Sequence, residues 1–443
     1  NSAPAFSFDP GGSNTLDTSV EFIGGFPTGG APLEQRDPDA YPPILSGDIN
    51  NDDGPDFTNR DDNAPLVLFT RARRTTIDGL TVRGGRAPNR TDYHPDQLNV
   101  LDLAAGGLRA VAEITIAHAR FTDNLGFTGG AIATDVAPSH DRGVLRVRDS
   151  VFENNRAVQQ GGALFLASGA QTQIVRSRFS RNAAPVGGAV AARDVDLNIA
   201  HAVFTANRAE SDDFTPFGGA LFAFDGSFGA RAPGEPRIQI VNSLFYGNSA
   251  PDGFVGGAWF ANNATIQNTV FSHNSDMRGD GADAQLSNHL TLSASDSAPP
   301  NFTTVNLVRG WADPARPGHT ILDQDPRFRD PLGPDGVLGT DDDDFSPVAG
   351  SPLIDAGAQP LTGGFEPVYR WADPEDLADL DLDGDTDEPA PDFTTLDFRR
   401  NPRNVDVPSA PNAAPLTNNQ TDLAVDLGPI EYQADCNDNG VLD

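Results

Sequence analysis

The middle of the chain repeats one pattern of hydrophobic and polar residues. A phenylalanine followed three positions later by an asparagine occurs six times: Phe121/Asn124, Phe152/Asn155, Phe179/Asn182, Phe204/Asn207, Phe245/Asn248 and Phe271/Asn274. The intervals between successive phenylalanines are 31, 27, 25, 41 and 26 residues. The sequence is therefore an array of repeats, each about 25 residues long with insertions of variable length.

Aligning the copies on phenylalanine shows which other positions are constant. The fifth residue before it is always β-branched: Ile116, Val147, Ile174, Ile199, Ile240 and Ile266. The second residue before it is always small: Ala119, Ser150, Ser177, Ala202, Ser243 and Thr269. The third is polar and varied: His118, Asp149, Arg176, His201, Asn242 and Asn268. Fixed apolar positions beside variable polar ones are typical of short strands, and the spacing predicts a bend between two of them.

A Gly-Gly-Ala triplet follows five copies, beginning at Gly129, Gly161, Gly187, Gly218 and Gly256, and the sixth has Gly279-Asp280-Gly281-Ala282. We expect the glycine pair to supply positive φ at a sharp corner and the alanine to fill a tight inside position. So short a unit cannot bury its own apolar face, whereas stacked coils can. The pattern predicts an all-β fold, a right-handed parallel β-helix whose phenylalanines stack about 4.8 Å apart. The asparagines should form a ladder of side-chain amides.

Other segments follow the pattern less clearly. Further strands are expected at residues 76–82 (with Asp78 facing outward), 98–103, 290–292 and 306–308. The stack should therefore end near residue 310. Residues 211–216 and 228–236 should be loops that project from the wall.

These patterns divide the chain into four parts. We expect an N-terminal cap and first coils (1–63), the β-helix repeats (64–310), a loop-rich C-terminal cap (311–434) and a truncated tail resembling a calcium repeat (435–443). The last coil of a solenoid presents unpaired strand edges and an apolar core, so residues 311–434 should pack on the last coils. A separate C-terminal domain is the alternative.

The repeat resembles a known family. Phe-x-x-Asn with Gly-Gly-Ala-[Ile/Leu/Val] looks like the passenger domains of polymorphic outer-membrane proteins and related bacterial β-helices, over most of residues 20–310. Segments 21–26, 35–38 and 44–49 resemble the first coils of such proteins from planctomycete-like bacteria. Segments 350–357, 399–403 and 425–431 are similar to the region that closes many bacterial surface β-helices. The resemblance implies a bacterial cell-surface or extracellular protein, often adhesive.

The net charge of the chain limits the kinds of partner that it can bind. The chain has 30 basic and 63 acidic residues, a net charge of −33, and every basic residue is arginine. Such a chain is repelled by nucleic acid and by anionic membranes. No apolar stretch approaches the ~18 residues of a membrane helix, so we expect no direct membrane insertion. The acidic surface fits either cation binding or a plain solvated surface.

Calcium is the cofactor that the acidic segments suggest. Asp379, Asp381, Asp383, Asp385 and Asp387 alternate around Gly384, which is the ligand spacing of an EF-hand-like loop. The twelfth position is Ala390 instead of glutamate, so Asp387 or Asp392 would complete the shell. A plain acidic loop is the alternative.

Two other segments are shorter or looser versions of this pattern. Asp435, Asn437, Asn439 and Asp443 surround Gly440 and resemble the start of a dockerin-like or thrombospondin type-3-like repeat, in which a second cysteine usually follows Cys436. In the N-terminal part, Asp48, Asn50 and Asp52 precede a glycine at the seventh position instead of the sixth. Calcium binding and a turn-forming loop are both open there. Asp335 and Asp341 to Asp344 form a further acidic cluster, for which a solvated surface is the preferred interpretation.

Histidine and lysine usage argues against several enzyme classes. The seven histidines have no HxH or HExxH spacing, and His118 and His201, at equivalent positions, are interpreted as surface residues. The chain contains no lysine, which excludes a lysine-dependent lyase mechanism. A pair of carboxylates for glycoside hydrolysis stays possible in so acidic a chain.

The sequence therefore predicts a non-enzymatic extracellular or cell-surface protein, structural or adhesive and stabilised by calcium. Its expected partners are surface or matrix glycans or proteins, with self-assembly possible through the open ends. The alternative is a secreted polysaccharide lyase or glycoside hydrolase that acts on the β-helix wall. An aromatic groove, converging carboxylates or an arginine–carboxylate group on the wall would favour sugar.

Overall fold

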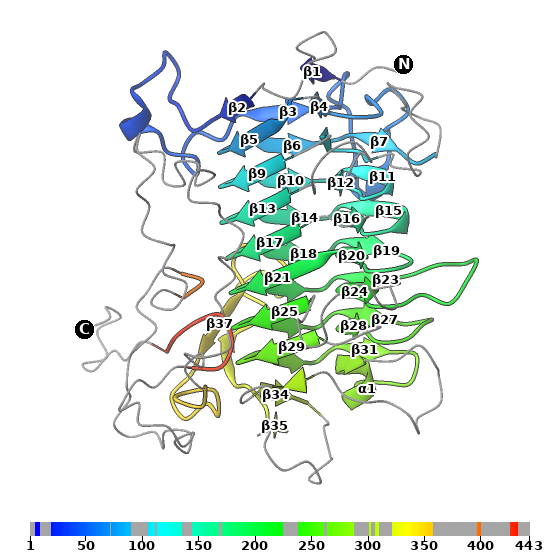
Figure 1. Cartoon of the computed structure of the whole chain (residues 1–443), viewed down its shortest axis with the longest axis vertical. Helices are drawn as coiled ribbons and strands as arrows, with labels where there is room; N and C mark the ends of the chain where they lie inside the picture. Colours follow the sequence, from blue (N-terminus) through cyan, green and yellow to red (C-terminus); the bar gives the residue numbers. More distant parts are fainter. Residues whose placement is uncertain are drawn as a thin grey trace.

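The chain winds into a parallel β-helix (Figure 1). The computed structural model describes residues 5–8, 19–70, 72–89, 105–110, 113–134, 144–167, 171–224, 238–260, 264–287, 301–302, 306–309, 321–357, 397–399 and 426–432. Short strands of successive coils lie side by side in four parallel sheets that run along one axis. The prediction of an all-β parallel β-helix is confirmed.

Sheets B and C form two adjoining walls. Sheet B contains, in spatial order, β2 (Ser19–Ile23), β5 (Arg74–Asp78), β9 (Glu113–Ala117), β13 (Val144–Arg148), β17 (Gln171–Val175), β21 (Asp196–Ala200), β25 (Ile238–Val241), β29 (Ala264–Gln267) and β33 (Asn301–Phe302). Sheet C contains β3 (Ile44–Ser46), β6 (Thr81–Arg83), β10 (Arg120–Thr122), β14 (Val151–Glu153), β18 (Arg178–Ser180), β22 (Val203–Thr205), β26 (Leu244–Tyr246), β30 (Val270–Ser272), β34 (Asn306–Val308) and β35 (Ile321–Leu322).

Sheets D and A complete each coil. Sheet D contains β7 (Arg86–Ala87), β11 (Leu125–Thr128), β15 (Arg156–Gln160), β19 (Ala183–Ala184), β23 (Arg208–Ala209), β27 (Ser249–Ala250) and β31 (Ser275–Asp276). Sheet A contains β1 (Phe6–Phe8), β4 (Leu68–Thr70), β8 (Leu108–Ala110), β12 (Ile132–Thr134), β16 (Leu164–Ala167), β20 (Val190–Arg193), β24 (Leu221–Phe224), β28 (Ala258–Phe260) and β32 (Leu286–Ser287). In each full coil the chain passes from sheet B to C, D and then A.

The few remaining elements lie outside the four sheets. They are the 3-10 turns η2 (Leu33–Gln35) and η3 (Pro55–Phe57), the one-turn helix α1 (Ala282–Gln285), and an antiparallel pair formed by β36 (Phe328–Asp330) and β37 (Asp344–Pro347). Of the weaker strand predictions, 76–82 and 306–308 coincide with β5, β6 and β34, whereas 98–103 and 290–292 lie outside the described residues. Because β35 pairs with β34, the stack extends one strand beyond the predicted end.

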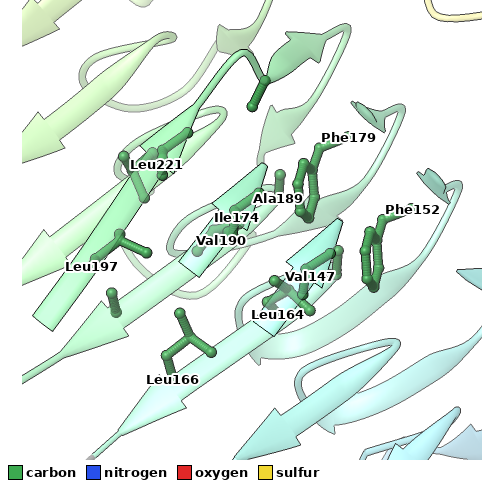
Figure 2. Close-up of a cluster of buried hydrophobic side chains, with 14 of the residues drawn as sticks. Val147, Phe152, Leu164, Leu166, Ile174, Phe179, Ala189, Val190, Leu197 and Leu221 are labelled. Carbon is green, nitrogen blue, oxygen red and sulfur yellow. The ribbon is translucent and has the colours of Figure 1, made fainter. Parts of the chain in front are cut away.

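The six phenylalanines stack along the interior of sheet C, as predicted. From Phe121 to Phe271 the centroids of neighbouring rings are 5.2, 4.8, 4.8, 4.6 and 4.7 Å apart, and their planes differ by 9° or less. Figure 2 shows Phe152 and Phe179 one above the other, with Val147 and Ile174 from sheet B beside them. All six rings are fully buried, so the repeat supplies one continuous core.

The six asparagines form the predicted amide ladder. In the first five, the Nδ2 atom donates to the Oδ1 atom of the asparagine in the next coil, at 2.9–3.0 Å. Each Oδ1 from Asn155 to Asn274 also accepts the backbone N–H of the preceding asparagine. Each Nδ2 from Asn155 onward donates a second bond to a phenylalanine carbonyl, such as Asn182 to Phe152 at 2.8 Å. The buried amides are therefore saturated with hydrogen bonds.

Left-handed residues turn the chain between sheets. The predicted bend three residues before each phenylalanine has φ between 42° and 53°, for example at Arg176. At the corner between sheets D and A, the first glycine of the pair has positive φ in the first four copies, as at Gly187, and the second glycine does not. The second glycine is required for another reason: a Cβ atom on Gly188 would lie 2.1 Å from the carbonyl oxygen of Gly219 in the next coil. The prediction that both glycines supply positive φ was therefore wrong for the second glycine.

The fifth and sixth copies depart from the predicted alignment. Ala258 pairs with Leu221, so the fifth Gly-Gly-Ala triplet lies one position later than the others, and Val255 (φ 62°) occupies the left-handed position. In the sixth copy α1 replaces the glycine corner. Gln285 on this helix accepts the bonds of Asn274 through Oε1, at 2.8 Å from Nδ2, and ends the ladder.

Two residues expected at the surface are buried. Asp78 is covered by Arg36 from the N-terminal segment and is 1% exposed. His201 is also 1% exposed and lies 3.3 Å from the Nδ2 atom of Asn242 in the next coil. The loop 211–216 contains no strand, as expected, whereas 228–236 lies outside the described residues.

The described part of the C-terminal region packs on the outer face of sheet C. A second apolar cluster joins Val203, Leu244 and Val270, on β22, β26 and β30, to Phe345 and Leu353. It also includes Leu307, Leu427 and Ile430. The region therefore covers the side of the last coils, and closure of the open end stays a prediction.

Candidate metal site in the N-terminal acidic loop

The loop after β3 gathers three aspartates. Oxygen atoms of Asp48, Asp52 and Asp62 all lie within 4.8 Å of one another. Asp48 lies two residues after the end of β3, and its carboxylate accepts the backbone N–H groups of Asp52 (3.2 Å) and Asp53 (3.3 Å). The loop thus folds around the side chain of Asp48.

The predicted ligand set is only partly brought together. Asp48 and Asp52 converge, but Asn50 contributes its backbone N–H, which donates to Oδ2 of Asp62 at 3.2 Å. Asp62 is the residue that sequence reasoning missed, because it follows Asp48 by fourteen positions and belongs to no regular spacing. The chain returns through η3 and the left-handed residues Asp56, Phe57 and Asn59. This turn places Asp62 beside the start of the loop.

Beneath the loop lies a partly satisfied polar layer. Asn63 donates through Nδ2 to Oδ2 of Asp53 (3.0 Å) and to the carbonyl of Gly84 (2.6 Å). Burial raises the pKa of Asp53, against the lowering effects of the Asn63 bond and the Arg60 cation, whose Nε lies 3.7 Å away. The Oδ1 atoms of Asp53 and Asn63 are buried without a hydrogen-bond partner. Two buried oxygen atoms next to the loop therefore accept no hydrogen bond.

The donor set matches a hard cation. Three carboxylates, with no histidine or cysteine in the group, are the ligand type of calcium instead of zinc or copper. Without a cation the three carboxylates repel one another at this separation. Residues Asp48, Asp52 and Asp62 are thus the described residues best suited to hold calcium.

The other predicted calcium residues cannot be placed. Asp379, Asp381, Asp383, Asp385 and Asp387 lie in the stretch 358–396, outside the described residues. Asp435, Asn437, Asn439 and Asp443 lie in the stretch 433–443, also outside them. Calcium at either segment stays a prediction.

In the acidic cluster 335–344, Asp335, Asp341 and Asp342 are exposed, in line with the preferred interpretation, and some members also form ion pairs. Asp341 pairs with Arg120 (2.6 Å) and with Arg178, so it joins the C-terminal segment to β10 and β18. Arg178 also donates to the carbonyl of Thr340. Asp344 is paired with Arg399 at 2.8 Å. Arginines therefore pair with two of the five aspartates. We call the contacts among Arg120, Arg178, Thr340 and Asp341 the arginine clamp.

Comparison with known proteins does not assign the chain to a family. No protein-family model matches the chain, and no curated protein matches it either. In the described part of the chain, no helix is both apolar and long enough to cross a bilayer.

Proposed function

We propose that the chain is a non-enzymatic structural or adhesive protein of the bacterial cell surface or extracellular space, stabilised by calcium. The observation that supports it best is the unbroken pair of ladders. Phenylalanine and asparagine side chains stack through six coils without a gap. The ten strands of sheet C, at about 4.8 Å per step, make a wall about 43 Å long. Such a stack presents the same outer positions repeatedly, so a partner with repeated epitopes gains avidity.

The finer parts of the proposal rest on the sequence. The Phe-x-x-Asn and Gly-Gly-Ala repeats are the basis for a relation to the passenger domains of bacterial surface β-helices, and the tail 435–443 for a dockerin-like or thrombospondin type-3-like repeat. The net charge of −33 supports an exterior rich in divalent cations and argues against nucleic acid as a partner. Surface or matrix glycans or proteins are the proposed partners. Digestion of intact source cells with a protease should remove the protein; complete protection would contradict a surface location.

Calcium binding is tested by thermal unfolding with and without chelator. At a calcium concentration of 100 times the Kd, one site would stabilise the folded chain by about 2.7 kcal/mol. We expect calcium to raise the Tm and excess EGTA to remove that increase. Asp62→Asn should abolish the calcium-dependent shift of the N-terminal site, because it removes one of the three converging carboxylates.

The matched control is Asp56→Asn. Asp56 is exposed in the same loop, has the same charge and lies outside the three converging aspartates, and asparagine tolerates its left-handed φ of 53°. This variant should keep the full shift. Since calcium at 379–387 or 435–443 would persist in both variants, titration calorimetry should show one fewer site in Asp62→Asn. Equal site numbers in the two variants would contradict the N-terminal site.

A further inference from the structure

A hollow lies where the C-terminal segment crosses the last coils of the β-helix. Its volume is about 390 Å³, within the range of small-ligand sites. Tyr246 and His273 form its wall on the β-helix side. Asp325, Arg327 and Phe328 line it from the C-terminal segment. Two parts of the chain far apart in sequence thus build one concave surface.

Aromatic rings make up the apolar part of the hollow. Tyr246 follows the stacked Phe245 in the sequence. The centroid of its ring lies 4.7 Å from that of the His273 imidazole, and the two planes are tilted by 38°. Phe328 meets Tyr246 edge to face at 5.7 Å between centroids. The buried Phe345 contacts both Tyr246 and Phe328, at 5.4 Å each. Because Phe345 supports both rings from behind, their positions are fixed before any ligand arrives.

Polar groups of several kinds surround these rings. Burial lowers the pKa of His273 and raises that of Tyr246, so both side chains are neutral near pH 7 and can each donate and accept hydrogen bonds. Nδ1 of His273 already contacts Oγ of Ser272 at 2.8 Å. Asp325 accepts the backbone N–H of Arg327 through Oδ1 at 2.9 Å, and this bond fixes the orientation of its carboxylate.

Rigid aromatic faces beside donors and acceptors of mixed type fit one ligand class. A sugar ring has C–H faces that pack on aromatic rings and hydroxyl groups that both donate and accept. The chain's net charge of −33 disfavours uronic acids and other anions. We propose that the hollow formed by Tyr246, His273, Asp325, Arg327 and Phe328 binds a neutral sugar ring.

This inference deepens the proposed adhesive function by naming the chemistry of a partner, and it rests on that function only for the sugar's source on a surface or in a matrix. Among the described residues that line the hollow, Asp325 is the single carboxylate. Glycoside hydrolysis ordinarily needs a pair of carboxylates across the scissile bond. The geometry therefore supports binding of sugar instead of its cleavage.

Isothermal titration calorimetry of the full chain tests the site. The three ligands are neutral tetrasaccharides, one built of glucose, one of mannose and one of galactose. Tetragalacturonate serves as the charged comparison. We expect saturable binding of at least one neutral tetrasaccharide, weakened about tenfold or more by Phe328→Ala and by Asp325→Asn. Phe214→Ala, which removes an exposed aromatic ring on the loop 211–216, should leave the affinity unchanged.

The outcomes separate the site from the proposed function. Absence of binding by all three neutral sugars, tighter binding of tetragalacturonate, or unchanged affinity in both Phe328→Ala and Asp325→Asn would overturn the site. Asp325 is exposed, so its variant keeps the test valid if Phe328→Ala has a lowered Tm. Release of new reducing ends during the titration would support the sugar site and contradict the non-enzymatic function. Loss of the calcium effect alone would leave the sugar site standing.

Discussion

At the scale of single residues, the buried amides are the most demanding part of the structure. Each asparagine of the ladder serves two neighbouring coils at once, as donor to one and acceptor for the other. A buried amide that loses its partner keeps the full cost of desolvation. The ladder therefore makes the stability of each coil dependent on its neighbours.

Asn182→Ala should lower the free energy of unfolding by about 3 kcal/mol. The backbone N–H and Nδ2 of Asn155 would lose their acceptor, and the carbonyl of Phe152 would lose a donor. Urea denaturation followed by circular dichroism measures the change. Asn50→Ala, at an exposed loop position, is the control and should be near neutral in the presence of EGTA. Equal stability of the two variants would contradict the role of the ladder.

Asp343 should make stability depend on pH. Burial raises its pKa to about 6, against the effect of the Gly339 N–H that its Oδ2 accepts at 2.7 Å. Between the unfolded value near 3.8 and about 6, the folded chain binds more protons than the unfolded chain, so stability falls as pH rises through this window. Asp343→Asn should therefore raise the Tm at pH 8 and have little effect at pH 4. Asp212→Asn, an exposed control, should show no such pH dependence; a Tm change in Asp343→Asn that is equal at both pH values would contradict the prediction.

At the scale of elements, a corner of the coil depends on the absence of a side chain. The second glycine of each pair lies against the backbone of the next coil, where no rotamer change can make room. A repeated glycine at such a site is explained by close approach of two backbones, and at the first position by a left-handed conformation.

Gly188→Ala should destabilise the fold by about 3 kcal/mol or more, because its Cβ would collide with the carbonyl oxygen of Gly219. Gly281→Ala is the matched control, since a Cβ there meets nothing within 4 Å. It should change stability by less than about 0.5 kcal/mol. Thermal unfolding of the two variants side by side decides the matter, and similar Tm losses in both would count against this packing argument.

The repeats explain why so much of the fold could be predicted from the sequence. Six aligned copies fix the positions of the phenylalanine, the asparagine and the bend, because each copy is bonded to the same position in the next coil. A contact that occurs only once in the structure leaves no repeated pattern in the sequence, so it cannot be predicted in this way. Asp62 meets Asp48 through an irregular loop, Gln285 replaces asparagine from a helix, and Asp341 reaches Arg120 across 221 positions. Sequence spacing alone could predict none of these three contacts.

At the scale of the whole molecule, the C-terminal segment fastens itself along the side of the β-helix. Apolar side chains around Phe345 cover the outer face of β22, β26 and β30, and the arginine clamp extends the contact to β10. The segment therefore bridges coils that are several turns apart, and it also forms one side of the proposed sugar site.

Arg178→Ala should loosen this segment without unfolding the coils. Arg178 contributes both its bond to Thr340 and its ion pair with Asp341, so we expect amide exchange in residues 336–345 to accelerate about tenfold. Hydrogen exchange read by mass spectrometry distinguishes this segment from the core strands. Arg156→Ala removes an exposed ion pair with Glu210 on another sheet and should leave the segment unchanged. Uniform acceleration along the chain, or none at all, would contradict the clamp.

The amide ladder also has a direction, and this sets how long the array can grow. Every Nδ2 points toward the following coil, so any coil added at that end must offer an oxygen at the matching place. Gln285 offers one, but its own amide nitrogen turns back to the carbonyls of Asn274 and Asp280, at 2.8 and 2.9 Å. Both N–H groups of the Gln285 amide are therefore used, and neither is available to donate to a further asparagine. A single glutamine therefore ends the amide ladder at this coil.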